Sequence, residues 1–465
     1  MRATPEKSCS ERLADWIVGA RFEDIPADVV AATRYRVLDV IGLALTGTDT
    51  AFGKSVRAST VELHAGGPSR LMASGERVAL TAAAFANGAF SQALEFDDTH
   101  NESIVHMSSP SVSAALAIAE CRPMTGRDFI AAVALGNEVS CRIGSVTPGQ
   151  IHRRGFHPTG LFAPVGVTYL AGKLFGLDAA QLANAAGIVG SFAAGILECW
   201  VDGTQSKFLH PGWAAQAGIT AASLGRSGTT GPKTVFEGRF GLIASHVQDA
   251  AVRRDYHRIT DGLGEFWESR HASLKPFPAA HVIHPYIDAI LALRAAHRID
   301  PRQVERITCP VAPYIVGIVC EPVAEKTRPQ SDSHGRVSFQ YTLAEALFAG
   351  ALGRTAYQPA SLGNPDILAL ADRVVYQVDA SFPGPERFKG VVRITMKDGR
   401  QFEHVEEHNR GCAENPMSRD EVLGKFRDNA GVALPDAQIS RLIEMVDGLE
   451  RLPSARSLMD AAVHA

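Results

Sequence analysis

The chain has 465 residues and a formal net charge of −4; 46% of its residues are hydrophobic and 21% are charged. This balance is typical of a globular protein, and the near-neutral charge excludes the basic field that binds nucleic acid or an anionic membrane. The length predicts roughly two to three domains of about 150 residues each.

Helical spacing of apolar residues dominates roughly the first 260 residues, with little strand signal. Two His-Pro pairs, at His157 and His210, predict helix starts, because proline suits the first helical turn. Thr125 and Asp128 have the spacing of a capping box. The predicted helices of this part are residues 10–20, 29–45, 81–93, 129–143 and 178–200.

The pattern changes near Asp261, after which helix and strand signals alternate. The clearest hairpin spans residues 390–404 around Asp398-Gly399, a pair favoured in type I′ turns. From Gly411 the helical pattern returns, and Ser418 begins a capping box. Between these points we predict helices at residues 283–297 and 337–348 and strands at 305–311 and 373–382.

The seven cysteines are scattered and none forms a C-x-x-C pair, which favours reduced thiols and a cytoplasmic setting. The first residues, MRATPEKSCSERLADW, lack the apolar core of a signal peptide. The longest apolar run, residues 179–194, is interrupted by polar and glycine residues. It is also shorter than the ~20 apolar residues that span a bilayer, so we predict a buried helix and no membrane contact.

Several well-known functional motifs are missing from the sequence: there is no P-loop, G-x-G-x-x-G after a strand, G-x-S-x-G or H-E-x-x-H. Nothing therefore indicates a nucleotide, a serine nucleophile or a zincin site. What stands out is a set of four polar stretches in apolar surroundings, each with a histidine. They are residues 95–106, 155–160, 205–210 and 275–284.

The residue types in these stretches suit proton transfer at carbon. Lys207 and Lys275 can bind carboxylates or stabilise a developing enolate. His106 and His157 can accept or donate a proton near neutral pH. Glu95 can orient a histidine or act as a base. The set predicts proton abstraction next to a carboxylate, followed by loss of water, loss of CO2 or reprotonation, with no nucleophile required.

Other interpretations of the same residues remain open. Asp97, Asp98, His100 and His106 are metal-ligand types and would suit a metal-dependent hydrolase, although their spacing matches no closed zinc pattern. The aspartates could instead cap the next helix. A non-catalytic helical dimer is a third hypothesis, and it predicts that the four polar stretches lie on separate surfaces.

Taken together, the ordered motifs resemble the MmgE/PrpD family over nearly the whole chain. That family includes 2-methylcitrate dehydratase, cis-aconitate decarboxylase and iminodisuccinate epimerase. The chain differs from the family pattern at Glu95, which replaces an aspartate, and at Met107, which replaces a proline. The matching segments are EFDDTH and HMS (95–100 and 106–108), GFHPTG (155–160), KFLHPGWAA (207–215), KPFP with a later histidine and DA pair (275–289) and SFQY (338–341).

The resemblance implies a mainly α homodimer of two-domain subunits, and the charge and apolar runs predict no nucleic-acid or membrane partner. A large all-helical domain would be built from residues 1–268 and 411–465. An α+β lid domain would be inserted between them, at residues 269–410. The active site would lie in the cleft between the two domains and bind a small di- or tricarboxylate without a metal or organic cofactor.

The resemblance also implies roles for individual residues. The expected catalytic residues are Glu95, His106, His157, Lys207 and Lys275. The expected substrate-binding residues are Thr99, His100, His210, His284 and Tyr314. The reaction expected first is that of a 2-methylcitrate dehydratase-like hydro-lyase; the alternatives are an epimerase of an iminodisuccinate-like substrate and a cis-aconitate-type decarboxylase, with the metal-dependent hydrolase more remote.

Overall fold

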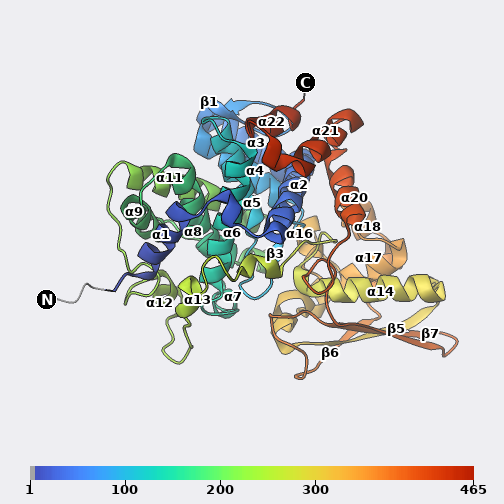
Figure 1. The fold of residues 1–465 in the computed structure, drawn as a ribbon. Helices are drawn as coiled ribbons and strands as arrows, with labels where there is room; N and C mark the ends of the chain where they lie inside the picture. The colour runs from blue at the N-terminus through green and yellow to red at the C-terminus, as the bar shows by residue number, and fades with distance from the viewer. Residues whose placement is uncertain (1–5, 465) are drawn as a thin grey trace.

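The computed structural model describes residues 6–464 and is mainly α, with 56% of the chain in helices (Figure 1). The sheets are small. This confirms the predicted fold class at that level. Among the described residues, no helix is long and apolar enough to cross a membrane.

Helices from both ends of the chain share one large hydrophobic core, which runs from Leu13 to Ala272 and resumes from Leu423 to Val463. The C-terminal helix α20 packs on α2, which joins the two ends of the chain (Figure 1). The longer helices of this part are α1 (Cys9–Gly19), α2 (Ala27–Asp49), α3 (Ala51–His64), α4 (Leu80–Gln92), α5 (Ser108–Ala119), α6 (Gly126–Gly144), α8 (Pro158–Phe175), α9 (Ala179–Val189), α11 (His210–Arg226), α20 (Arg419–Ala430) and α21 (Asp436–Asp447).

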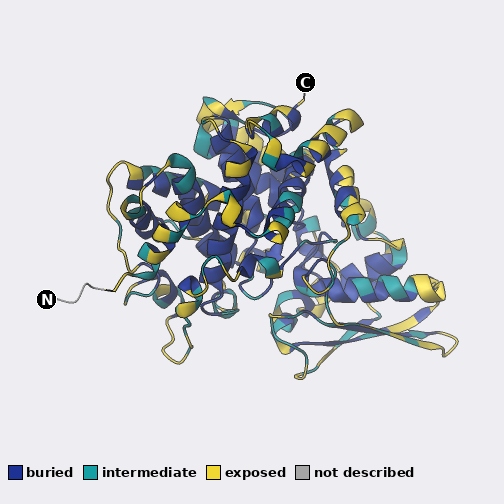
Figure 2. Ribbon diagram, in the orientation of Figure 1, coloured by how far each residue is buried: buried dark blue, intermediate teal, exposed yellow. Residues whose placement is uncertain are grey.

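Small residues let the central helices approach closely. A Cβ atom added to Gly88 in α4 would lie 2.9 Å from the Cα of Gly212 in α11, so the two backbones nearly touch there. Figure 2 shows that these inner helices are buried along most of their length. The shorter elements of the same part are α7 (Gln150–Arg153), α10 (Cys199–Asp202), α12 (Leu242–Val247), α13 (His257–Thr260), α22 (Arg456–Ala461), β1 (Ala65–Arg70), β2 (Arg77–Val78), β3 (Thr99–His100) and β4 (Ala272–Ser273).

A second hydrophobic core lies between Phe277 and Met396. Its four-stranded sheet has the order β6-β5-β7-β8, with β5 and β6 parallel and the other neighbours antiparallel. Helix α14 packs on β7 and β8, and α17 packs on α14. The elements are α14 (His284–His297), β5 (Val304–Val311), α15 (Val323–Lys326), α16 (Asp332–Gly335), α17 (Phe339–Ala349), α18 (Pro359–Leu362), α19 (Pro365–Ala371), β6 (Val374–Val378), β7 (Gly390–Met396) and β8 (Gln401–Glu406).

Two local predictions were wrong. The helix expected at residues 178–200 ends at Val189, because the next segment bonds to residues near the start of α8 instead. The backbone N–H of Ala194 donates to the Gly160 carbonyl at 3.1 Å, and that of His157 donates to the Gly195 carbonyl at 3.0 Å. The hairpin between β7 and β8 exists, but only Gly399 has a positive φ at its turn, so the turn is not type I′.

Short contacts beside the predicted site join segments distant in sequence, and those of Arg336 link the second core to the first part. Strands β3 and β4 pair antiparallel, with Thr99 opposite Ser273. The fully buried guanidinium of Arg336 donates to the carbonyls of Leu94 and Pro278, both at 3.0 Å. These bonds hold the segment after α4 against the segment that follows β4, so residues about 180 positions apart become neighbours.

Candidate active site

A small cavity of about 70 Å³ lies where the two cores meet. All four polar stretches of the sequence contribute to its wall, so they do not lie on separate surfaces. Seven of the predicted site residues line it: Glu95, Thr99, His106, His157, Lys207, Lys275 and Tyr314.

Glu95 is the charged centre of this cavity. It follows α4 with a φ of +54°, a left-handed conformation that is uncommon for a non-glycine residue. Its carboxylate accepts a hydrogen bond from the Nζ of Lys207, and its other oxygen lies 3.3 Å from the Nζ of Lys275. All three side chains are buried.

The two lysines decide the ionisation of Glu95. Burial alone would raise the pKa of a carboxyl group. The charges of Lys207 and Lys275 outweigh that burial and hold the pKa of Glu95 well below its usual range. Glu95 is therefore a carboxylate at neutral pH. Two ammonium groups against one carboxylate leave one positive charge in excess, which favours an anionic ligand.

His106 is held as a neutral base. Its Nδ1 lies 2.9 Å from the carbonyl oxygen of Asp98, which can only accept, so Nδ1 carries the proton and Nε2 keeps a lone pair. That Nε2 is 3.7 Å from Glu95, and the Thr99 hydroxyl lies 3.2 Å from Nδ1. Burial, together with the charges of Lys275 and Lys207, keeps the pKa of His106 well below its ordinary value.

His157, the residue before α8, forms a pair with His210, the first residue of α11. Their Nδ1 atoms are 2.8 Å apart, so one ring donates to the other and the tautomer of His157 depends on His210. The Nε2 of His157 is buried and has no partner among the described residues. Burial, Lys207 and His210 hold the pKa of His157 well below its ordinary value, so it too is neutral at pH 7. The rings of His106 and His157 are 5.4 Å apart, which places two proton carriers at one cavity.

Asp97 and Asp98 shape the loop around these groups. Both oxygens of Asp98 accept hydrogen bonds from Ser108 at the start of α5, at 2.6 and 3.2 Å. Asp97 accepts from the Ser109 hydroxyl at 2.9 Å. Burial raises the pKa of Asp97 to about 7, because the neighbouring lysine charges only partly offset it. Asp97 therefore titrates inside the protein near neutral pH.

This shift predicts a pH-dependent stability. Unfolded Asp97 has a pKa near 3.8, so between that value and about 7 the folded chain holds an extra proton and loses stability as the pH rises. From pH 6 to pH 8 we expect Asp97 to lower the free energy of unfolding by about 1 kcal/mol. Urea unfolding of the wild type and of Asp97→Asn at both pH values measures this. The fall in the free energy of unfolding from pH 6 to pH 8 should be smaller in Asp97→Asn than in the wild type, and the exposed control Asp202→Asn should show the wild-type fall. An equal fall in the wild type and in Asp97→Asn would contradict the raised pKa of Asp97.

Three predicted substrate-binding residues lie behind the cavity wall and do not line it. His100 bonds to the Ser103 hydroxyl at 2.7 Å and faces Glu268 at 3.6 Å. His210 supports His157, as described above. His284 begins α14, and its Nε2 lies 3.1 Å from the Ala279 carbonyl.

The structure adds residues that the sequence analysis did not select. His281, three positions before His284, lines the cavity and accepts a 2.9 Å bond from the side-chain amide of Asn409, so its proton is on Nδ1. His152 and Trp200 pack edge to face, with ring centroids 5.0 Å apart, and also line it. His281 lay within a stretch already marked by its lysine and histidines. His152 and Trp200 had no motif to identify them.

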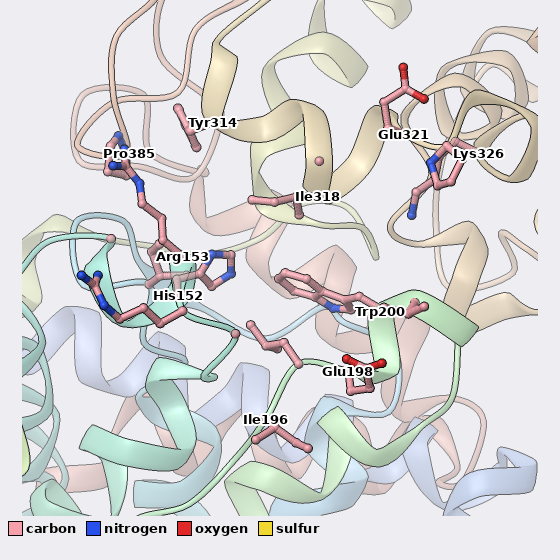
Figure 3. Close-up of a pocket in the computed structure, with 18 of the residues that line it drawn as sticks. His152, Arg153, Ile196, Glu198, Trp200, Tyr314, Ile318, Glu321, Lys326 and Pro385 are labelled. Carbon is pink, nitrogen blue, oxygen red and sulfur yellow. The ribbon is translucent and has the colours of Figure 1, made fainter. Parts of the chain in front are cut away.

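A larger cavity of about 720 Å³ adjoins the first. The two share His152, Trp200 and Tyr314, together with Ile104, Ile318 and Pro385. Figure 3 shows this outer cavity, with Trp200 and His152 on one side and Tyr314 and Ile318 on the other. The shared side chains form a partition between an outer space and the charged inner cavity.

The alternative metal set does not form a compact cluster. Asp98 is bound to Ser108 and faces Arg36, whereas His100 faces Glu268. Among residues 6–464, the only group of three or more ligand atoms close enough to hold an ion lies elsewhere, at His408, Cys412 and Glu414. The geometry thus favours proton transfer over a metal centre built from Asp97, Asp98, His100 and His106.

Comparison with known proteins agrees with the sequence motifs. The chain is 25% identical to a cis-aconitate decarboxylase-like protein, oryM, of Aspergillus oryzae, with 98% of each chain covered. It is 26% identical to the cis-aconitate decarboxylase of Aspergillus terreus (97% and 95% covered) and to that of Mus musculus (96% and 91% covered). The MmgE/PrpD N-terminal domain matches residues 11–255 and the MmgE/PrpD C-terminal domain matches residues 277–451. The chain therefore belongs to the MmgE/PrpD family.

Proposed function

We propose that the protein is a lyase that acts on a small tricarboxylate by moving a proton at a carbon next to a carboxylate. The observation that carries this proposal is the convergence of Lys207 and Lys275 on Glu95 in a buried cavity that two neutral histidines also line. The excess positive charge attracts a polycarboxylate. Because the site is buried, each charge interacts more strongly there than in water.

In this proposal the two lysines stabilise negative charge and the two histidines transfer protons. The lysine ammonium groups bind a substrate carboxylate and stabilise the enediolate-like charge that develops when the adjacent carbon loses its proton. His106 accepts a proton at Nε2, since its Nδ1 proton is bound to the Asp98 carbonyl. His157 exchanges the second proton, with His210 taking up the change of tautomer.

Decarboxylation of cis-aconitate is the reaction we propose to test first, because the named relatives are cis-aconitate decarboxylases or similar to them. In that reaction His157 delivers an Nε2 proton to the alkene carbon while the bond to one carboxylate breaks and CO2 leaves. Because the ring is neutral at rest, that proton is replaced through its Nδ1 contact with His210, which takes one up from solvent. Dehydration of a 2-methylcitrate-like hydroxy acid is the second candidate. The pair His106 and His157 favours it, because one imidazole can accept the carbon-bound proton and the other can protonate the departing hydroxyl. An epimerase would return the proton to the opposite face of the same carbon.

The arrangement of the chain around the site supports further proposals. We propose that residues 269–410 form a lid over a helical domain made of residues 1–268 and 411–465. Tyr314, Ile318 and Pro385 support this, because they close the inner cavity from the side of the second core. The homodimer and the cytoplasmic location stay predictions; light scattering of the purified protein tests the first and cell fractionation the second.

Proton NMR in D2O tests the proposed function. The enzyme is incubated with a panel of citrate-, aconitate- and aspartate-like acids, and the signals next to each carboxylate are followed. Loss of CO2 identifies a decarboxylase, loss of water a dehydratase, and deuterium uptake with inversion an epimerase. If no acid reacts or exchanges a proton faster than with heat-denatured enzyme, the proposal is wrong. Turnover that persists after exhaustive chelation would remove the metal-dependent hydrolase.

A further inference from the structure

The loop after β8 is held in a defined conformation and contacts His281, which lines the cavity. Gly411 has a φ of +94° and donates its N–H to the Asn415 carbonyl at 2.7 Å. The side chain of Asn415 donates to the His408 carbonyl at 3.1 Å, which closes the loop on itself. A Cβ on Gly411 would lie 1.8 Å from the Leu274 oxygen, so only glycine fits there.

Three side chains of this loop meet at one point. A ring nitrogen of His408, the sulfur of Cys412 and a carboxylate oxygen of Glu414 all lie within 4.8 Å of one another. Cys412 is buried and has no disulfide partner, His408 is half-buried, and Glu414 is exposed. Thiolate, imidazole and carboxylate together are a ligand set that zinc prefers, whereas magnesium and calcium prefer oxygen ligands alone.

We propose that His408, Cys412 and Glu414 bind a zinc ion. Around a tetrahedral zinc ion, with bonds of about 2.0–2.3 Å, ligand atoms lie roughly 3.3–3.8 Å apart. The ligand atoms therefore need to approach one another by at most about 1.0–1.5 Å, and the exposed side chain of Glu414 can supply that movement. Three protein ligands leave the fourth position for water.

The bound ion stabilises a loop that supports the catalytic cavity. Asn409, which lies between His408 and Cys412 in sequence, donates a side-chain hydrogen bond to His281, which lines the cavity. Gly411 accepts from the backbone N–H of Leu274, the residue before Lys275. An ion that fixes the loop thus fixes the supports of two cavity residues without touching substrate. The site goes beyond the proposed function and does not depend on which reaction the protein catalyses.

Cobalt titration of the untagged, full-length protein tests the site, because a cobalt–thiolate bond gives an ultraviolet charge-transfer band that histidine and carboxylate ligands do not give. We expect one cobalt ion to bind per chain and to give this band, and we expect added zinc to displace the cobalt and remove the band. Cys412→Ser should abolish the band. Glu414→Gln, a change at an exposed side chain that is safe for folding, should weaken cobalt binding by more than about tenfold, since even supporting groups around a metal contribute 10- to 100-fold. The matched control Cys121→Ser removes an exposed thiol far along the chain and should leave the band unchanged.

Thermal unfolding gives a second readout. A ligand at about 100 times its Kd stabilises the folded state, so saturating zinc should raise the Tm of the wild type and of Cys121→Ser by about 3 °C. It should raise the Tm of Cys412→Ser by clearly less. No thiolate band in the wild type, a band that survives in Cys412→Ser, or equal binding by the wild type and Glu414→Gln would overturn the proposal.

Discussion

Replacing Lys207 with methionine is expected to lower kcat by about 100- to 1000-fold on the substrate that NMR identifies. Removal of one preorganised group that stabilises a developing negative charge typically costs that much. Methionine keeps most of the side-chain length and apolar contact, so the change removes mainly the ammonium group that bonds to Glu95. Steady-state kinetics, with calorimetric titration of a tricarboxylate such as citrate, separates the loss in kcat from the loss in binding.

Stability measurements show whether the loss is chemical. Breaking a buried ion pair costs about 3–5 kcal/mol when it leaves an unpaired charge. Here Lys275 still lies 3.3 Å from Glu95, so the free energy of unfolding should fall by less than that. The control Lys389→Met removes an ammonium group that contacts Glu407 and Phe382 outside the cavity, and it should keep normal kcat. A folded Lys207→Met enzyme with wild-type kcat would rule out the role given to Lys207.

His157→Ala is expected to lower turnover by about 10²- to 10⁴-fold, the usual contribution of a positioned acid or base. Its Nε2 is buried beside the cavity without a partner among the described residues, so the ring is available for proton exchange with a bound substrate. Deuterium exchange at the substrate carbon should slow together with turnover. Both are measured by NMR and by steady-state kinetics.

The matched control for this variant is His297→Ala. That ring is exposed, stacks on Phe402 with centroids 4.2 Å apart and does not line the cavity. It should retain normal turnover and exchange. If folded His157→Ala kept both at wild-type levels, the proton would be handled by His106 alone or by another group, and the proposed division of roles would be wrong.

Much of the helical fold could be predicted from local patterns. The capping boxes at Thr125 and Ser418 form as expected, and proline follows His157 and His210 at the starts of α8 and α11. These features depend on neighbours three or four residues apart, which a sequence displays directly. The prediction that the helix continues beyond Val189 was wrong because contacts between residues distant in sequence decide this segment. Its alanine-rich sequence favours a helix, but bonds to the segment around Gly160, some 30 residues earlier, replace the helical ones.

The candidate site was predictable in its chemistry and not in its details. The motifs marked the residues whose side chains now meet, including Glu95 with Lys207 and Lys275. They also marked His284, whereas His281 is the neighbour that reaches the cavity. The choice between these two histidines depends on how the turn before α14 packs against Asn409, which is 128 residues away. No local pattern contains that information.

The sequence by itself determined the helical character of the chain, the hairpin of the second core and the four polar stretches, because short-range periodicity and turn chemistry specify them. Only the tertiary structure decided that Glu95 sits between lysines 112 and 180 positions away. It also decided which histidines are neutral and where their protons lie, because burial and charges from distant segments set both. The physical reason is the same in each case: propensity acts between neighbours, whereas electrostatic and packing energies depend on distances that exist only after folding.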